Sequence, residues 1–400
     1  MTARGSSGHL EPLVPIARAA IAAGHEVMVS AQHQHRANVE RTGLALAPVG
    51  DPPEHEWKPR LGEFAAMDLD TGDAAMIGDF FARVDTRAAL PDLLEIVSRW
   101  APDVIVRETW EFASTIAAEL HGIPILRVGL GLAAVEERTI RHAAAAIDDV
   151  RADAGLPPDP AGDRLRDEPY LTQMPALLDG PAGAIARRVH RFRARPPAIA
   201  EPAEPLVYLS LGSVAPGAHL PYYPVLYRAA IDALAPLPAQ VLVTIGSDRD
   251  PAELGPLPPN VRVERWVPQD EVLPRAAAVV CHGGSGTTLG ALAYGVPLVV
   301  LPLFALDQWD NAAAVARVGA GVALGNERRT RRAIELPAPD TLDRLGGAVL
   351  RVLEDDAYRR AAGHVADAVR SLPPVSSTVD ALVGSAARSE VSGVQPGATG

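Results

Sequence analysis

The sequence predicts an α/β fold of two domains, each built on a parallel sheet. Apolar runs alternate with helical patterns along the chain, which is typical of parallel strands joined by crossover helices. A proline-rich stretch that is poor in large apolar residues, 195–205, divides the chain into halves of similar size. The length of 400 residues also favours two domains over one. We expect an N-terminal domain over 1–195, a linker over 196–205, a C-terminal domain over 206–386 and a disordered tail over 387–400. A cleft between two such domains is a natural ligand site.

The first half of the chain contains helical patterns that end at glycine or before short apolar strands. We expect helices over 15–23, 90–100 and 112–121, and strands over 26–30, 104–106 and 123–128. Residues 50–90 and 133–170 lack clear periodicity, so they are expected to be loop or irregular helix, where binding surfaces usually lie. The basic run 187–193 is expected to be a solvated helix face beside the linker.

The second half repeats the alternation. We expect strands over 206–211, 241–245 and 261–265, a helix over 224–234 and a final helical region over about 340–386, with its crossing back to the N-terminal domain left open.

Composition excludes several classes of protein. A net charge of −12 and the absence of a long basic run argue against nucleic-acid binding. A single cysteine excludes an internal disulfide framework and fits a reducing compartment. No apolar stretch reaches the roughly 18 residues that span a bilayer, and no signal-peptide pattern begins the chain. We therefore expect a cytoplasmic protein without a membrane segment.

Residues 278–301 predict an anion site. An apolar strand ends at His282, and Gly283 and Gly284 then lead into a short helix that stops at Gly295 before a second buried strand. The first N–H groups of a helix lack partners and the dipole is positive there, so a phosphate can bind. Ser285, Gly286, Thr287 and Thr288 supply close backbone approach and hydroxyl donors, and His282 adds a possible cation. A tight structural turn is the alternative interpretation.

Three motifs in close order carry a resemblance to a known family. They are His282-Gly-Gly-Ser-Gly-Thr287, Arg265-Trp-Val-Pro-Gln269 and Pro302-Leu-Phe-Ala-Leu-Asp-Gln-Trp-Asp-Asn-Ala312. Together they resemble the nucleotide-sugar-dependent glycosyltransferases of the plant, mammalian and antibiotic-tailoring superfamily, over about residues 3–386. The resemblance implies the GT-B fold, with two Rossmann-like domains facing each other across a cleft. It also implies that the C-terminal domain holds the sugar donor and the N-terminal domain holds the acceptor.

The resemblance assigns the donor site residue by residue. Trp266 would stack on a pyrimidine, the Val267 backbone would bond the base edge, and Gln269 could reach the ribose. Asp307 and Gln308 would bond sugar hydroxyls, with Asn311 as a neighbour. The diphosphate would be bound by Ser213, His282, Gly284, Ser285, Gly286 and Thr287. The alternatives are a core aromatic for Trp266, a helix N-cap for Ser213 and a cap or surface acid for Asp307.

The acceptor side of the resemblance centres on Gly5-Ser-Ser-Gly-His-Leu-Glu-Pro12. His9 stands where the family has its general base, and a neutral imidazole can accept the hydroxyl proton of the acceptor. A carboxylate on the other ring nitrogen would orient the ring and stabilise the imidazolium. Glu108 stands where relatives usually carry Asp, and Glu111 is the alternative partner. A loop or capping role is the alternative for His9.

Metal catalysis is not expected. Asp68-Leu-Asp70 and Asp248-Arg-Asp250 match the Asp-x-Asp metal string, but both lie in acid-rich, loop-like stretches outside the matching motifs. The helix dipole, His282 and hydroxyl donors can stabilise the leaving diphosphate instead. We expect no metal and no cofactor, with the nucleoside diphosphate sugar as co-substrate.

The chain departs from the family pattern at two places. Relatives begin with an apolar strand before the glycine-rich loop, whereas this chain offers only Met1-Thr-Ala-Arg4. We expect that loss to expose core, to leave a gap in the hydrogen bonding of the sheet and to impair stability, with a misassigned start or a truncated sequence as the simplest explanation. Relatives that use UDP-glucose often carry Glu eight residues after the motif histidine, where it binds ribose; here that residue is Gly290. A 2′-deoxyribose loses less without that carboxylate, which favours a dTDP-sugar.

These observations predict an inverting, metal-independent glycosyltransferase of antibiotic or other natural-product biosynthesis. It would move a hexose or deoxyhexose from a nucleoside diphosphate sugar, with dTDP favoured over UDP-glucose, to a hydroxyl of a small, apolar acceptor. A non-catalytic helper protein of the same fold and a sugar-nucleotide epimerase are the alternatives, and a homodimer is left open.

Overall fold

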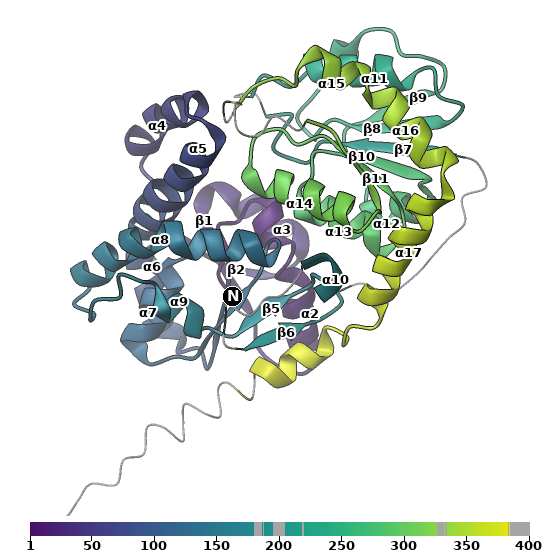
Figure 1. The fold of residues 1–400 in the computed structure, drawn as a ribbon. Coiled ribbons are helices and arrows are strands. Elements are labelled where there is room, and N and C mark those ends of the chain that lie inside the picture. The colour runs from purple at the N-terminus through teal and green to yellow at the C-terminus, as the bar shows by residue number, and fades with distance from the viewer. Residues whose placement is uncertain are drawn as a thin grey trace, which may run out of the picture.

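The computed structural model describes residues 1–179, 186, 188–194, 205–217, 220–325, 332, 334–382 and 384. Each half of the chain forms its own parallel sheet with helices packed on it, which confirms the predicted fold class (Figure 1). The expected linker, apart from residue 205, and the expected tail lie outside the described residues.

The C-terminal sheet has six parallel strands in the order β12-β11-β10-β7-β8-β9. Its strands are β7 (Leu206–Ser210), β8 (Gln240–Thr244), β9 (Val261–Glu264), β10 (Ala278–Cys281), β11 (Leu298–Val300) and β12 (Gly321–Ala323). Its main helices are α11 (Val225–Leu234), α12 (Gln269–Val272), α13 (Ser285–Ala293), α14 (Leu306–Arg317), α15 (Pro339–Asp343), α16 (Leu345–Glu354) and α17 (Asp356–Arg370). The expected strands and helices of this half are confirmed to within a few residues.

The strand order of this sheet reverses between β7 and β10, because β8 and β9 lie on one side and β11 and β12 on the other. Ligands of open α/β sheets bind outside the carboxyl ends of the strands at such a reversal. Successive residues of β7 point to opposite faces, so Tyr208 and Leu209 pack in different apolar clusters. Both faces of the sheet are therefore covered by packed side chains, and a ligand can bind at the carboxyl ends of β7 and β10.

The N-terminal sheet is formed by β1 (Met28–Gln32), β2 (Ala45–Val49), β3 (Ile105–Glu108), β4 (Ile125–Val128), β5 (Tyr170–Thr172) and β6 (Val189–Arg191). Its helices are α1 (Ser7–Leu10), α2 (Val14–Ala22), α3 (Arg36–Thr42), α4 (Glu54–Ala66), α5 (Leu69–Ala75), α6 (Thr86–Trp100), α7 (Ala113–His121), α8 (Ala133–Asp153), α9 (Asp163–Asp167) and α10 (Ala176–Asp179). A 3₁₀ turn, η1 (His33–His35), precedes α3, and a π-helical stretch, η2 (Met76–Asp85), joins α5 to α6.

The first residues of the chain fill the place of the strand that we expected to be missing. Thr2 donates its N–H to the Val106 carbonyl at 2.8 Å, and Ala3 donates to the Ser30 carbonyl at 3.0 Å. These residues thus lie between β1 and β3 and pair with both. The expected gap in the hydrogen bonding is wrong, because three extended residues suffice to pair with the short strands on either side.

The two segments without clear periodicity are mostly helical. Residues 50–90 contain α4, α5 and the irregular η2, so the expectation of loop or irregular helix is confirmed there in part. Residues 133–170 contain the regular 21-residue α8, and the same expectation is wrong for that helix. The helix α8 buries alanines together with charged residues such as Glu136, Arg138 and Arg151. Its core-facing side therefore carries little of the apolar signal by which an amphipathic helix is recognised.

Residues 188–193 of the basic run are not a helix face, and residue 187 lies outside the described residues. The run contains β6, which pairs with β5, and Phe192 directly after β6 is fully buried. Arg191 forms an ion pair with Asp179 at 2.8 Å, and the Arg193 N–H donates to the Pro373 carbonyl at 2.8 Å. The side chain of Arg191 and the backbone of Arg193 thus bind groups of the protein, where we expected a solvated surface.

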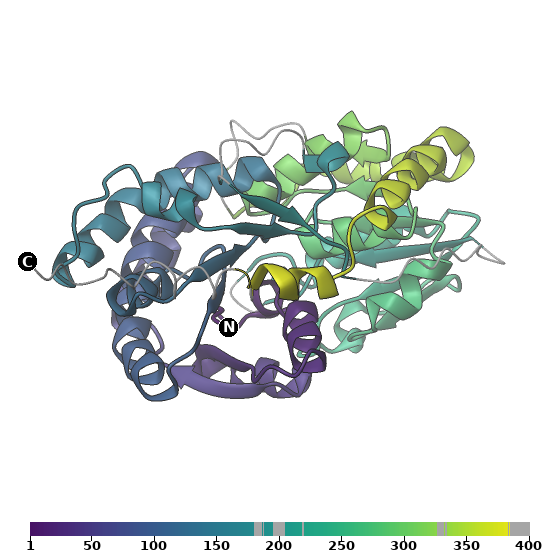
Figure 2. The same cartoon turned by 90° about the horizontal axis from the view of Figure 1, so that it is seen from below.

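The end of the chain returns to the N-terminal half. Residues 376–382 are helical and lie beside the N-terminal helices drawn in purple (Figure 2). The side chain of Leu382 packs in the apolar cluster of Leu13, Ile16 and Val29. In the part of the chain that the structure describes, no helix is both long and apolar enough to span a membrane.

Candidate active site

His9 and Glu108 meet at the carboxyl end of the N-terminal sheet. His9 lies in the short helix α1, and Gly5 before it has φ +93°; a side chain there would collide with His35. Glu108 is the last residue of β3 and is fully buried. The Nδ1 atom of His9 lies 3.0 Å from Oε1 of Glu108. The loop after the first extended segment and the end of β3 thus bring together two residues that are 99 positions apart.

Several contacts hold Glu108 ionised in a buried place. Burial opposes its charge, but the charge and hydrogen bond of His9, the Trp110 N–H and the Arg4 charge outweigh burial and lower the pKa of Glu108. The Trp110 N–H donates to Oε2 at 2.6 Å, and the Arg4 N–H donates to Oε1 at 3.3 Å. Glu111, the alternative partner, instead accepts the Ser114 N–H at the start of α7 at 3.2 Å. The geometry therefore pairs His9 with Glu108.

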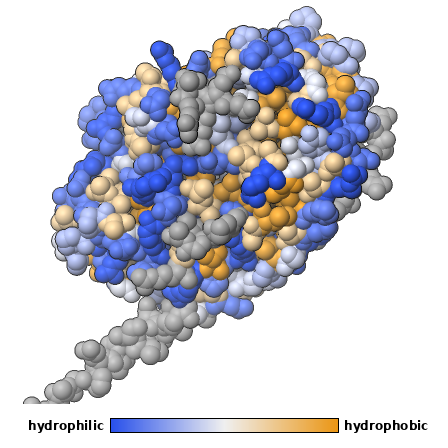
Figure 3. Space-filling model, viewed as in Figure 1, coloured by the Kyte–Doolittle hydropathy of each residue, from blue (hydrophilic) through white to orange (hydrophobic). Residues whose placement is uncertain are grey.

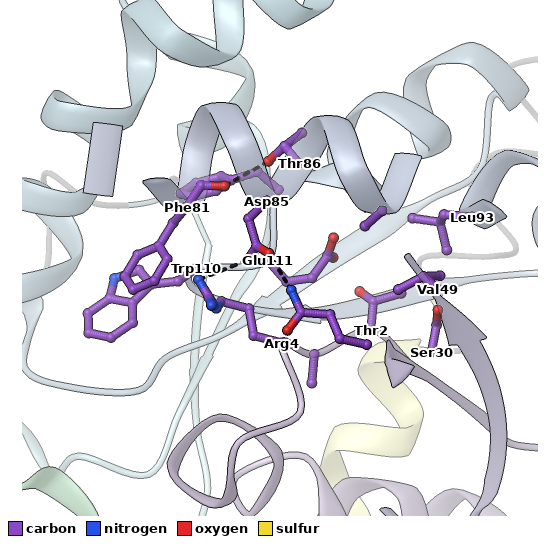
Figure 4. A pocket seen from close by; sticks show the side chains of 14 residues that line it. Thr2, Arg4, Ser30, Val49, Phe81, Asp85, Thr86, Leu93, Trp110 and Glu111 are labelled. Atoms are coloured by element: carbon purple, nitrogen blue, oxygen red, sulfur yellow. Dashed lines mark hydrogen bonds and ion pairs between the residues drawn. The ribbon is translucent and has the colours of Figure 1, made fainter. Parts of the chain in front are cut away.

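Aromatic side chains form the wall beside His9. The Trp110 ring lies 5.1 Å from the His9 ring between centroids and stacks on Phe81 at 5.3 Å. Phe81 and Trp110 also line a pocket, together with Arg4 and Asp85 (Figure 4). Half-buried aromatic rings beside the His9 imidazole can contact an apolar ligand while a hydroxyl of that ligand reaches the imidazole.

The predicted anion loop is built as expected, at the end of β10. Gly283 has φ +92°, and a Cβ atom there would lie 2.7 Å from the Gln308 carbonyl oxygen, so only glycine fits. The helix α13 begins at Ser285, and its first N–H groups face this loop without acceptors in their own helix. The Asn311 amide of α14 donates to the Gly283 carbonyl at 2.7 Å and to the Ser285 hydroxyl at 3.1 Å. Asn311 therefore braces the loop.

His282 is not the cation that we considered. Burial lowers its pKa to about 4, against the opposing effect of a hydrogen bond with the Ser210 backbone. The imidazole is therefore neutral near pH 7, and it stacks with Phe304 at 6.2 Å between centroids. The sequence could not predict this, because it does not show that Gly212 and Gly284 lie so close to the imidazole that a Cβ atom on either would collide with it. Positive potential in the loop comes from the helix end and not from His282.

The pair Asp307 and Gln308 lies in the first turn of α14. The Gln308 side chain is buried, and its oxygen accepts the N–H groups of Leu303 and Phe304 at 2.8 and 3.1 Å. Only the amide NH₂ of Gln308 is left to contact a sugar. Burial, and then the charge of Asp73, raise the pKa of Asp307 to about 7.

The N-terminal half reaches across to this same turn of α14. Arg138 on α8 pairs with Asp73 on α5 at 3.0 Å and with Asp310 on α14 at 2.7 Å. An apolar cluster of Leu69, Leu306 and Trp309 packs beside this bridge. Sequence reasoning missed this bridge because Arg138 and Asp73 belong to no motif, and Asp310, although it lies in the motif Pro302–Ala312, shows no partner along the chain.

The segment that is predicted to bind the nucleoside has an exposed tryptophan. Trp266 follows β9 and is 68% exposed, the largest exposure of any large apolar side chain among the described residues. This exposure excludes the core alternative for Trp266 and leaves the ring free to stack on a base. Exposed hydrophobic residues are not unusual for this molecule, because on the face drawn in Figure 3 they are scattered among hydrophilic ones. The Gln269 amide donates to the Thr287 hydroxyl at 3.0 Å, which joins the base segment to the anion loop, while Val267 is half-buried.

Ser213 lies in an exposed turn after β7, next to the loop of His282.

The two Asp-x-Asp strings form hydrogen bonds with their own neighbours along the chain. Asp68 caps α5 by accepting the Thr71 N–H at 3.0 Å, and Asp250 caps a short 3₁₀ helix by accepting the Ala252 N–H at 3.0 Å. Within the described ranges, no group of three His, Cys, Asp or Glu side chains is placed to hold a metal ion. The absence of a metal requirement stays a prediction.

Comparison with known proteins places both halves in one family. Residues 18–166 match the N-terminal domain model, and residues 228–384 the C-terminal domain model, of erythromycin biosynthesis protein CIII-like proteins. The chain is 33% identical to the L-demethylnoviosyl transferase of Streptomyces niveus over 377 residues, covering 90% of this chain and 94% of the relative. It is 32% identical to the elloramycin glycosyltransferase ElmGT of Streptomyces olivaceus over 398 residues, covering 92% and 91%. The crystal structure of the glycosyltransferase VinC with dTDP has a TM-score of 0.69 and 26% identity, covering 97% of this chain and 99% of VinC.

Proposed function

Because this chain belongs to the erythromycin biosynthesis protein CIII-like family and is a glycosyltransferase of natural-product biosynthesis, we propose that it transfers a deoxyhexose or hexose from a dTDP-sugar with inversion and without a metal. The acceptor in this proposal is a hydroxyl of a small, apolar natural product. The observation that carries it is the contact between His9 and the buried, ionised Glu108 beside an aromatic wall.

His9 is the general base of the proposed reaction. With Nδ1–H donated to Glu108, the imidazole presents a free lone pair at Nε2. Nε2 takes the proton of the acceptor hydroxyl as its oxygen attacks the anomeric carbon, and the bond from that carbon to the diphosphate oxygen breaks. Attack opposite the leaving group inverts the anomeric centre. Glu108 then faces an imidazolium, whose charge it stabilises without taking the proton.

The leaving diphosphate is stabilised by neutral donors. The unpaired N–H groups at the start of α13 carry the positive end of its dipole, and the hydroxyls of Ser285 and Thr287 lie in the same turn. His282 contributes here as a neutral imidazole. Ser213, Gly284 and Gly286 complete the proposed diphosphate site, and Asp307 with the Gln308 amide contacts the sugar.

The preference for deoxythymidine rests on two observations. Gly290, eight residues after His282, lies buried in α13 and offers no carboxylate for a ribose 2′-hydroxyl. VinC, which is similar over nearly its whole length, was crystallised with dTDP. We therefore expect tighter binding of dTDP than of UDP.

The test is transfer by a His9→Ala variant from a dTDP-deoxysugar to a panel of hydroxylated aglycones, with products identified by mass spectrometry. The variant should bind dTDP as the wild type does, measured by calorimetry, and lose transfer by about 10³-fold or more. Near wild-type transfer by this variant would exclude His9 as the base. Transfer from UDP-glucose at least as fast as from dTDP-sugars would exclude the donor preference.

The alternatives are distinguished by the same measurements. A helper protein would give no product with any acceptor, and an epimerase would convert the sugar nucleotide without an acceptor. A homodimer stays a prediction, which analytical ultracentrifugation tests.

A further inference from the structure

We propose that Asp85 is a positioning residue for the base: by holding the Arg4 guanidinium, it leaves the Glu108 carboxylate to His9. The inference rests on the proposed role of His9, and neither Arg4 nor Asp85 belongs to any motif of the sequence. Both residues line the pocket next to the aromatic wall (Figure 4).

Arg4 is fixed beside the base by its own backbone. Its N–H donates to Glu108 Oε1 at 3.3 Å, the oxygen that also contacts His9. Its guanidinium lies between Asp85 and the aromatic wall, with Nη1 at 2.8 Å from Asp85 Oδ2 and the central carbon 3.8 Å from the centre of the Phe81 ring (Figure 4). An arginine cannot lose its charge in a protein, so this buried cation always needs an anionic partner.

Two carboxylates compete for that cation. The negative charges of Asp85 and Glu108 both act on Arg4, and that of Asp85 acts more strongly. Gln32 donates a hydrogen bond to Asp85 and fixes it on η2 facing Arg4. A guanidinium pairs readily with any carboxylate in reach. After Asp85, Glu108 is the carboxylate whose charge acts most strongly on Arg4, and without Asp85 a pair between Arg4 and Glu108 would take Glu108 from His9.

The charges around His9 show which group sets this balance. Glu108 contacts His9, and the charge of His9 acts on Asp85 on η2 and on His35 on η1. The charge of Arg4 acts on these same three groups, and Glu111 acts on Arg4. Burial, together with the charges of Arg4 and His9, lowers the pKa of His35 to about 4, so His35 stays neutral above pH 5. Burial raises the pKa of Glu111, which makes it a weak competitor for Arg4. The charges of Arg4, Asp85 and Glu108 therefore set the electrostatic potential at the His9 imidazole.

The experiment is the pH profile of kcat/KM for the acceptor in an Asp85→Asn variant. The uncompensated charge of Arg4 disfavours the imidazolium, so the acidic limb should move to lower pH by about one pH unit. The maximal rate should fall at the same time, because Glu108 is drawn from His9. The double variant R4M/D85N removes both charges and should return the limb to its wild-type position. A structural role alone would lower the rate at every pH, leave the limb in place and give no rescue.

Glu119→Gln is the matched control. Glu119 pairs with the buried Arg151 between α7 and α8, and its loss also strands a buried arginine, but away from His9. This variant should lose stability, but the acidic limb of its pH profile should stay at the wild-type position. Should Asp85→Asn fail to fold, Gln32→Met keeps the Asp85 carboxylate and removes its hydrogen bond from Gln32, together with a bond that Gln32 accepts from Gln34, and should move the limb in the same direction by less.

A limb that stays in place in a folded Asp85→Asn variant, or a double variant that folds and does not restore it, overturns the inference. In the fallback, an unmoved limb in Gln32→Met does the same. His9→Ala separates this failure from that of the proposed function. If His9→Ala is inactive and the limb is unmoved, only the role of Asp85 falls; if His9→Ala is active, the base itself is wrong.

Discussion

Replacing Asp307 by Asn should stabilise the free enzyme at alkaline pH while weakening its hold on the sugar. Burial, with the repulsion of Asp73, raises the pKa of Asp307 to about 7 from an ordinary value of 3.8. Below pH 3.8 the carboxyl is protonated in both the folded and the unfolded state, and the protein has the full stability that the neutral group allows. As pH rises toward about 7, the carboxyl ionises first in the unfolded state, so the free energy of unfolding falls. Above pH 7 the ionised group costs the folded protein up to about 4 kcal/mol.

The assay compares melting temperatures of wild type and Asp307→Asn at pH 5 and pH 8. At pH 8 the variant should melt at least about 4 °C higher, since part of that cost is removed, and at pH 5 the gain should be much smaller. The exposed Asp343→Asn on α15 is the control and should change neither value. The variant should also bind a dTDP-sugar about 10-fold more weakly, through loss of a charged hydrogen bond, and bind dTDP without change. A gain in melting temperature that is the same at both pH values would refute the reasoning.

Two further predictions concern the donor site. Trp266→Ala should weaken dTDP binding by about 10- to 100-fold without changing the melting temperature, because the exposed ring contributes to stacking and not to the core; calorimetry measures the first and an unchanged affinity would contradict it. Arg138→Met removes the bridge from Asp73 to Asp310 between the two halves, so the donor KM should rise several-fold and the radius of gyration in solution scattering should increase. Arg83→Met, which breaks an exposed ion pair within the N-terminal half, is its control, and equal effects of the two changes would argue against a role for the bridge.

Much of the fold could be predicted because its signals are local. The strands β7 to β11 are short apolar runs bounded by glycine and proline, and each was found within a few residues of its expected place. The helix α8 escaped prediction because its core-facing positions carry Glu136, Arg138 and Arg151, whose partners lie on other elements. The segment Met1–Ala3 escaped because three residues show no periodicity, although they pair with strands on both sides.

The sequence by itself determined the identity of the groups that can do chemistry: a histidine in a glycine-rich loop, an anion loop before a helix, and an Asp-Gln pair in a third motif. These follow from spacing along the chain, because the turn, the loop and the first turn of a helix are formed by neighbouring residues.

Only the tertiary structure decided the charge states and partners of those groups. It paired His9 with Glu108, and it placed Glu111 where it accepts the Ser114 N–H. Burial favours the neutral form of His282, and burial, followed by a charge from the other half of the molecule, raises the pKa of Asp307. The reason is that burial and charge at a site depend on segments that come together only on folding. The motif therefore predicts where a histidine stands in the chain, whereas the groups that pack around its ring set its affinity for a proton.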